Sequence, residues 1–279
     1  MIFLAILLAL GGLQLWGSRN PLQRDGWFCG PLRRLTQGPW APLGLTAAVC
    51  CLVVLPVAGL ALVSVYSREH YWWLWLPMAT AVLLYSVGRG PYGTLIADYI
   101  EACRAEQWAA ALTACKNLGR EPSNIAPGDW PNLHAAFLEQ ASYRGFERVF
   151  AVLFWFLLAG PAGALLYRLS ALLAESQPRP LLQRWLWLME WPSVRVLSLS
   201  FAFTGNFLGC VQAWRRYYRC VTSPSSLVIA QSVLGALSVG EGTTQTSAVT
   251  RRELMAMRSL FGRTLWFWLG TLALLTLRG

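Results

Sequence analysis

The sequence predicts an all-α protein built from several membrane-spanning helices, and three observations lead to that fold class. The 279-residue chain is 56% apolar and 13% charged, about half the charged fraction of a soluble protein. Its charges are concentrated between long uncharged stretches. Aromatic residues such as Tyr71 and Trp73 stand at the ends of these stretches, as aromatic residues do at membrane–water interfaces.

Four uncharged stretches are long enough to cross a bilayer, because a spanning helix needs about 20 mostly apolar residues. They lie between residues 34 and 68, 70 and 89, 148 and 168, and 195 and 215. A fifth helix over Thr264–Leu277 would measure only about 21 Å, so we expect it to extend past Arg263. The apolar run Met1–Ser18 lacks the features of a signal peptide and is expected to stay in the mature chain. Whether residues 1–18 span the bilayer stays open.

The basic residues fall mainly on one side of this arrangement. Segments Gly17–Leu43, Arg89–Arg148 and Arg215–Arg263 hold 17 Lys and Arg, against 6 in the other connections and ends. Since cytoplasmic loops are rich in Lys and Arg, we expect these three segments to be cytoplasmic and Glu175–Glu190 to be external. The net charge of +10 is explained by this placement and by contact with the lipid bilayer, so nucleic acid is not expected as a partner.

Residues 1–279 are expected to form a single membrane domain. Two of its cytoplasmic segments are long enough to be more than connections between spans. Residues 89–148 are expected to form a small helical lobe, because apolar residues recur at helical spacing up to Leu118. Asp129 followed by Pro131 predicts the start of a second helix that continues into the third span. Residues 217–263 are rich in Ser, Thr and Gly and are expected to be mainly loop.

The sequence contains no motif of a known catalytic centre: P-loop, GxSxG, HExxH and GxGxxG patterns are all absent. The seven cysteines have no metal-ligand spacing with His70 and His134, so we expect no disulfide, no metal site and no cofactor. The carboxylates of the lobe, including Asp98 and Glu139, could hold a metal, but we expect them to be solvated helix surface.

Two positions within the predicted spans break the apolar pattern. Pro161 should kink the third span, where Gly160 and Ala164 provide a small-residue packing face. Asn206 lies near the middle of the fourth span, where its amide needs a partner. We expect close packing of the two helices, with Asn206 donating to the Leu157 carbonyl that Pro161 leaves open; a binding notch is the alternative.

No residue is assigned a catalytic role. The candidate residues of a ligand or packing site are Asp25, Asp98, Glu139, Trp155, Gly160, Pro161, Glu190, Arg195 and Asn206. Of these, Glu190 and Arg195 lie beside a cluster of external tryptophans. Such aromatic residues are expected to anchor an interfacial helix, with a ligand rim as the alternative.

Gln23–Asp25, Leu153–Trp155, Gly160–Arg168 and Glu190-Trp191 followed by Val194-Arg195 occur in an order and spacing that resemble the AmpE family of bacterial inner-membrane proteins. The resemblance implies a multi-pass, non-catalytic sensor or modulator linked to cell-wall recycling and β-lactamase induction. It also implies a protein partner in cell-wall recycling and a small ligand derived from the cell wall. The oligomeric state, including a homo-oligomer, stays open.

AmpE is similar in turn to the membrane adenosylcobinamide-phosphate synthase, an ATP- and Mg²⁺-dependent amide-forming enzyme of cobalamin assembly. Ser223-Pro224 and Ala236–Val239 echo the synthase pattern. The synthase has acidic and Asn residues where this chain has Tyr143-Arg144, Glu147-Arg148, Ala171–Ala174 and Leu186-Trp187. Because phosphate and Mg²⁺ chemistry depends on such groups, the sequence predicts that the chain is not an enzyme. An altered ATP-dependent ligase and a transporter of cell-wall fragments are the alternatives.

Overall fold

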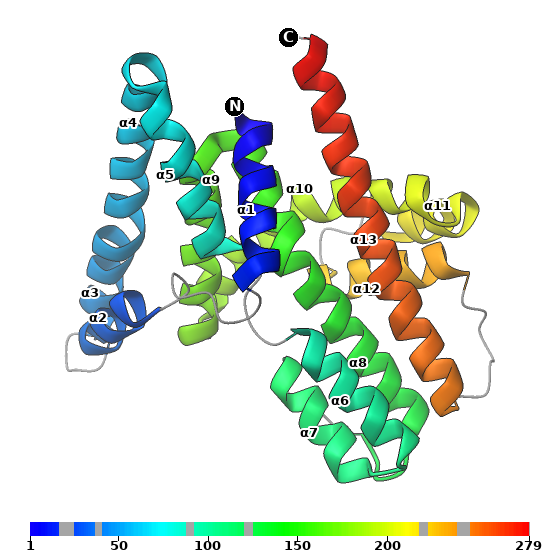
Figure 1. The fold of residues 1–279 in the computed structure, drawn as a ribbon. Helices are drawn as coiled ribbons and strands as arrows, with labels where there is room; N and C mark the ends of the chain where they lie inside the picture. The colour runs from blue at the N-terminus through cyan, green and yellow to red at the C-terminus, as the bar shows by residue number, and fades with distance from the viewer. Residues whose placement is uncertain are drawn as a thin grey trace. The chain divides into compact units, whose positions relative to one another are not determined.

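The computed structural model describes residues 1–16, 25–36, 41–87, 92–119, 125–217, 223–238 and 246–278, and the regular elements among them are all helices (Figure 1). The all-α fold class is therefore confirmed for this part of the chain. The chain forms two compact units. Unit 1 consists of Met1–Arg89 and Ala151–Met189, and unit 2 consists of Gly90–Phe150 and Glu190–Gly279.

Unit 1 is organised around α9. Its elements are α1 (Ile2–Trp16), α2 (Gly26–Thr36), α3 (Ala41–Ala48), the π-helical η2 (Val49–Val54), α4 (Leu55–His70), α5 (Trp72–Ser86), α9 (Ala151–Ser176) and the first part of α10 (Pro180–Thr204). α9 packs against α4, α5 and η2, and α5 also packs against α1. Phe28 and Leu32 of α2 are buried together with Leu169 and Leu172 of α9, which joins α2 to the same core.

Two helical runs among the described residues are long and apolar enough to cross a bilayer, Gly44–Arg68 and Trp130–Ser176. Three further apolar helices are shorter: Ile2–Leu15, Trp73–Ser86 and Ser225–Leu237. The first run is not a buried core helix, because it exposes large apolar side chains such as Leu55 and Leu62. Lipid would cover such a surface. These helices agree with a helical membrane protein, whereas the number of five spans stays a prediction.

The chain reverses direction inside α9, where the sequence predicts only a kink. Ala159 and Gly160 leave helical geometry, and Gly160 has φ +65° and ψ −155°, a conformation that glycine alone adopts readily. In a straight helix, Trp155 and Gly163 would lie eight residues and about 12 Å apart. In the structure they are so close that a Cβ atom on Gly163 would collide with the Trp155 carbonyl oxygen. The third predicted span is therefore a helical hairpin that turns near the α9 label in Figure 1.

This hairpin brings together two segments that the sequence places on opposite sides of the membrane. Nη2 of Arg168 lies 3.5 Å from Oδ2 of Asp25, and Nε2 of Gln177 donates to Oγ1 of Thr36 at 3.2 Å. Atoms in contact lie at the same depth, whereas the hydrocarbon core of a bilayer is about 30 Å thick. The prediction that one segment is cytoplasmic and the other external is therefore wrong.

Unit 2 contains the predicted helical lobe. Its elements are α6 (Tyr92–Arg104), α7 (Trp108–Leu118), α8 (Trp130–Gly145), the π-helical η3 (Phe146–Phe150), the rest of α10, α11 (Phe207–Tyr217), α12 (Ser225–Leu237) and α13 (Ser247–Arg278). Helices α6, α7 and α8 pack together, and α13 runs along α6, α8 and α12 (Figure 1). Asp129 caps α8 by accepting from the Asn132 N–H, which confirms the predicted helix start. As predicted, the C-terminal helix extends past Arg263.

The predicted fourth span, residues 195–215, is interrupted. α10 ends at Thr204, and Asn206 caps α11 by accepting from the Gly209 N–H at 3.3 Å through its side-chain oxygen. Nδ2 of Asn206 donates to the Ser238 hydroxyl at 2.6 Å. The predicted bond from Asn206 to Leu157 is therefore wrong, because the amide serves a helix start rather than standing alone within a span.

The segment 217–263 contains more helix than its composition predicts. Its described residues form α12 and the first half of α13. Pro224 stands at the N-cap of α12 with extended backbone, which allows a helix to begin directly after the Ser-Pro pair. Most of the Gly- and Thr-rich stretch expected to be loop, residues 239–245, lies outside the described residues.

Candidate functional site

Polar side chains gather where α8 passes into the π-helical turn η3. Tyr143 and Arg144 are the last polar residues of α8, Glu147 and Arg148 belong to η3, and Glu190 comes from α10. These five residues, all in unit 2, are called the Tyr143 cluster. Short π-helical turns occur frequently at functional sites, because they place side chains that a regular helix would direct elsewhere.

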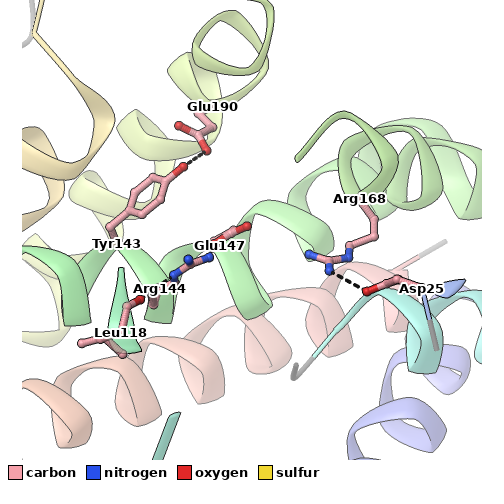
Figure 2. Close-up of polar contacts among 7 residues, drawn as sticks. All are labelled: Asp25, Leu118, Tyr143, Arg144, Glu147, Arg168 and Glu190. Carbon is pink, nitrogen blue, oxygen red and sulfur yellow. Dashed lines mark hydrogen bonds and ion pairs between the residues drawn. The ribbon is translucent and has the colours of Figure 1, made fainter. Parts of the chain in front are cut away.

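Glu190 is the most buried member of the cluster, with 3% of its surface exposed. The Tyr143 hydroxyl donates to its Oε1 at 2.6 Å (Figure 2), a length typical of a hydrogen bond to an ionised carboxylate. The Ser193 hydroxyl donates to the backbone carbonyl of the same residue at 2.9 Å. Since burying an unbonded carboxylate is costly, Tyr143 both stabilises Glu190 and fixes its orientation.

Arg144 and Arg148 place two positive charges beside these acids. Nη1 of Arg144 donates to Oε2 of Glu147 at 2.8 Å, and its Nε donates to the Leu118 carbonyl at 2.8 Å (Figure 2). The guanidinium of Arg148 lies 5.0 Å from the centre of the Tyr92 ring, within the range of a cation–π contact. The cluster therefore combines fixed carboxylates with fixed guanidinium groups.

The charges of the cluster suit a phosphate group better than a structural metal ion. Among the residues that the structure describes, no three His, Cys, Asp or Glu side chains are grouped to hold a metal. Mg²⁺ needs fewer protein ligands, because it is commonly held by one or two carboxylates and by the phosphates of a substrate. Glu147 fits that requirement, and Arg144 and Arg148 suit phosphate oxygens.

A second polar group, called the Arg168 triad, lies in unit 1 and consists of Asp25, Tyr85 and Arg168. Asp25 lies directly before α2, Tyr85 belongs to α5 and Arg168 to the second arm of α9. The Tyr85 hydroxyl donates to Oδ1 of Asp25 at 3.0 Å. Nη2 of Arg168 lies 3.5 Å from Oδ2 of Asp25, and Figure 2 shows this ion pair. The Arg168 side chain is 12% exposed and that of Asp25 is 23% exposed.

Two of the sequence-predicted residues build the α9 hairpin. Gly160 forms its turn, and the buried Pro161 begins its second arm. A third, Trp155 on the first arm, donates from Nε1 to the Met189 carbonyl at 3.2 Å. In the structure these residues make packing and backbone contacts within unit 1.

The remaining predicted residues are dispersed within unit 2. Asp98 is exposed on α6, whereas Glu139 on α8 accepts from the Ser226 hydroxyl at 2.6 Å. The Arg195 guanidinium lies 4.2 Å from the centre of the Trp191 ring, one helical turn away on α10. The anchoring role expected of the tryptophans stays a prediction.

The sequence does not indicate a buried pair that joins the lobe to α13. Nε2 of His134 on α8 lies 2.7 Å from Oε2 of Glu253 on α13, with side chains only 6% and 11% exposed. The Tyr99 ring lies beside the imidazole, and burial raises the pKa of its phenol well above the usual value. Burial also raises the pKa of the Cys115 thiol to about 11. Since 119 positions separate His134 and Glu253, no local pattern could have indicated their contact.

Comparison with known proteins gives a relative in cobalamin biosynthesis. The chain is 28% identical over 232 residues to the cobalamin biosynthesis protein CobD of Stutzerimonas stutzeri (strain A1501), which covers 79% of this chain and 72% of CobD. The chain is a distant homologue of CobD. No protein-family model and no solved structure matches the chain.

The homology to CobD contradicts the prediction that the chain is not an enzyme, since a biosynthesis protein points to catalysis. That prediction counted Glu147-Arg148 among the departures from the synthase pattern. In the structure the carboxylates of Glu147 and Glu190 are both held by hydrogen bonds in the Tyr143 cluster. The AmpE family, and with it signalling and β-lactamase regulation, is not shown by the comparisons.

Proposed function

We propose that the chain is an enzyme of cobalamin biosynthesis that forms an amide bond with consumption of ATP, like the synthase family that its sequence resembles. The homology to CobD is the observation that carries this proposal. The match covers 79% of the 279 residues. A match of that length must include the middle of the chain, and with it residues 143–190, at whichever residue it begins. The Tyr143 cluster therefore lies within the homologous part.

The cluster contains the groups that such a reaction requires. In ATP-dependent amide formation, the amine nitrogen bonds to an activated acyl carbon, the phosphate-bearing group leaves with the bonding electron pair, and the amine loses a proton. Glu190 is the candidate acceptor of that proton, and Tyr143 is the positioning residue that fixes its carboxylate. Arg144 and Arg148 would offset the charge of the leaving phosphate.

Mg²⁺, when bound together with ATP, would add charge neutralisation at the phosphates, and Glu147 is the residue of the cluster that would hold it. In the structure the carboxylate of Glu147 is only 10% exposed and is paired with Arg144. An ion pair of this kind is costly to bury on a helical run otherwise apolar enough to cross a membrane. Its presence there supports a functional role.

Complementation tests the proposal directly. A strain that lacks CobD and must synthesise cobalamin would receive this chain, and growth should be restored. The purified protein in detergent should form the cobinamide product only with ATP, as followed by chromatography of the corrinoid. Failure in both assays, with the protein present in the membrane, would contradict the proposal.

Variants of the cluster connect the activity to the site. Glu190→Gln should lower the rate by about 10²- to 10⁴-fold, the contribution typical of a general base. Tyr143→Phe removes the hydroxyl but keeps the ring, and should lower kcat with little change in KM. Asp98→Asn, on the exposed face of α6, is the matched control and should leave the rate unchanged. Equal rates for Glu190→Gln and Asp98→Asn would exclude Glu190 from catalysis.

A further inference from the structure

Arg168 is largely buried, and one of its N–H groups has no hydrogen-bond acceptor among the described residues. Its ion pair with Asp25 is 3.5 Å long, whereas charge-assisted N–H···O bonds usually measure about 2.7–2.9 Å. Its Nε is fully buried and finds no acceptor among the described residues. Arginine carries five N–H donors, and leaving a buried donor unbonded is unfavourable.

The geometry of the guanidinium indicates what would complete it. Nε and Nη2 lie on one edge of the guanidinium plane, the pair of donors that binds two oxygens of a carboxylate or phosphate side by side. Asp25 engages this edge through one oxygen at long range, while its other oxygen accepts from Tyr85. The edge is therefore incompletely filled by the internal carboxylate.

We propose that the Arg168 triad is an anion-binding site that takes a phosphate group, and that Asp25 is an internal carboxylate which the phosphate displaces. A phosphate offers enough oxygens to accept from Nε and Nη2 of Arg168 and from the Tyr85 hydroxyl at once. The positive end of α2, which begins directly after Asp25, favours an anion there. The site lies within unit 1 and does not depend on the proposed amide-forming activity.

The phosphate can belong to a soluble compound or to a lipid headgroup, and the experiment separates these two sources. The full chain would be reconstituted in phosphatidylcholine nanodiscs and titrated with inorganic pyrophosphate by calorimetry. If the source is soluble, the wild type binds pyrophosphate and Arg168→Gln weakens binding by about ten- to a hundredfold, the range of a charged hydrogen bond. Asp25→Asn should tighten binding several-fold, because the competing carboxylate is gone.

For the lipid source, the protein would be extracted from membranes that contain phosphatidylglycerol, and retained lipid would be counted by mass spectrometry. Arg168→Gln should then retain less phosphatidylglycerol than the wild type. Arg184→Gln, an exposed arginine of α10 in the same unit, is the matched control in both assays. Arg168→Lys keeps the charge without the two-donor edge, so it tests the geometry if Arg168→Gln does not fold.

The proposal is overturned if the wild type and the Arg168 variants behave alike in both assays. It is also overturned if Asp25→Asn weakens anion binding as much as Arg168→Gln does, because the pair would then be a structural ion pair only. These outcomes are independent of the complementation result. A chain without amide-forming activity can still bind phosphate at Arg168, and an active chain can fail to do so.

Discussion

Replacing Gly163 with alanine tests the reversal of α9 through the sign of its effect. In a straight exposed helix, Gly→Ala stabilises by about 0.5–1 kcal/mol. In the hairpin, the new Cβ would lie against the Trp155 carbonyl oxygen and only 2.8 Å from the Ala159 Cβ. Overpacking of this kind costs about 1–3 kcal/mol, so Gly163→Ala should destabilise the protein by about 1–2 kcal/mol net.

The measurement is reversible unfolding in mixed micelles with increasing SDS, followed by far-UV circular dichroism. Gly59→Ala in α4 is the matched control, because nothing lies within 4 Å of a Cβ built at Gly59. It should leave the free energy of unfolding unchanged or raise it slightly. If Gly163→Ala is as stable as Gly59→Ala, the two arms of α9 do not approach each other, and the hairpin is refuted.

Two further predictions concern polar contacts within unit 2. Asn206→Ala removes the cap of α11 and the bond to Ser238, and should lower the free energy of unfolding by about 1–2 kcal/mol; Asn206→Asp keeps the capping oxygen and should lose less in the same SDS titration. Glu253→Gln should destabilise by about 1–3 kcal/mol, because it weakens a buried bond to His134. A double-mutant cycle with His134→Leu should show coupling between the two sites, and additive effects would contradict their contact.

The parts of the fold that local pattern determines could be predicted from the sequence. Asp129 before Pro131 gives a helix start wherever the helix packs, and the apolar spacing up to Leu118 gives a helix of the lobe. The break in α9 could also be predicted, because Pro161 cannot complete a helical hydrogen bond. The angle between the two arms of α9 could not be predicted, since the reversal depends on the contact of Gly163 with the preceding arm.

The prediction for Asn206 was wrong for a different reason. Its place within an uncharged stretch suggested a polar group inside a span, whereas Gly205-Asn206 before Phe207 is equally a helix stop followed by a helix start. Only the partner helix α12, which supplies Ser238 beside its end, distinguishes these interpretations. Glu190 of the candidate site could be predicted as a candidate residue from the sequence. Its contact with Tyr143 could not, because 47 positions separate the two residues. Long-range pairs of this kind carry no local periodicity.

The α9 hairpin also changes what must cross the membrane when the protein is inserted. If the third span were straight, Arg168 and the arginines after it in unit 1, Arg179 and Arg184, would have to be translocated. Insertion measurements place the cost of an arginine at the centre of a bilayer at about 2.5–3.5 kcal/mol. The contact with Asp25 instead puts the second arm on the same side as α2. If α2 lies in the cytoplasm, as its arginines Arg33 and Arg34 predict, none of these cations would have to cross the bilayer.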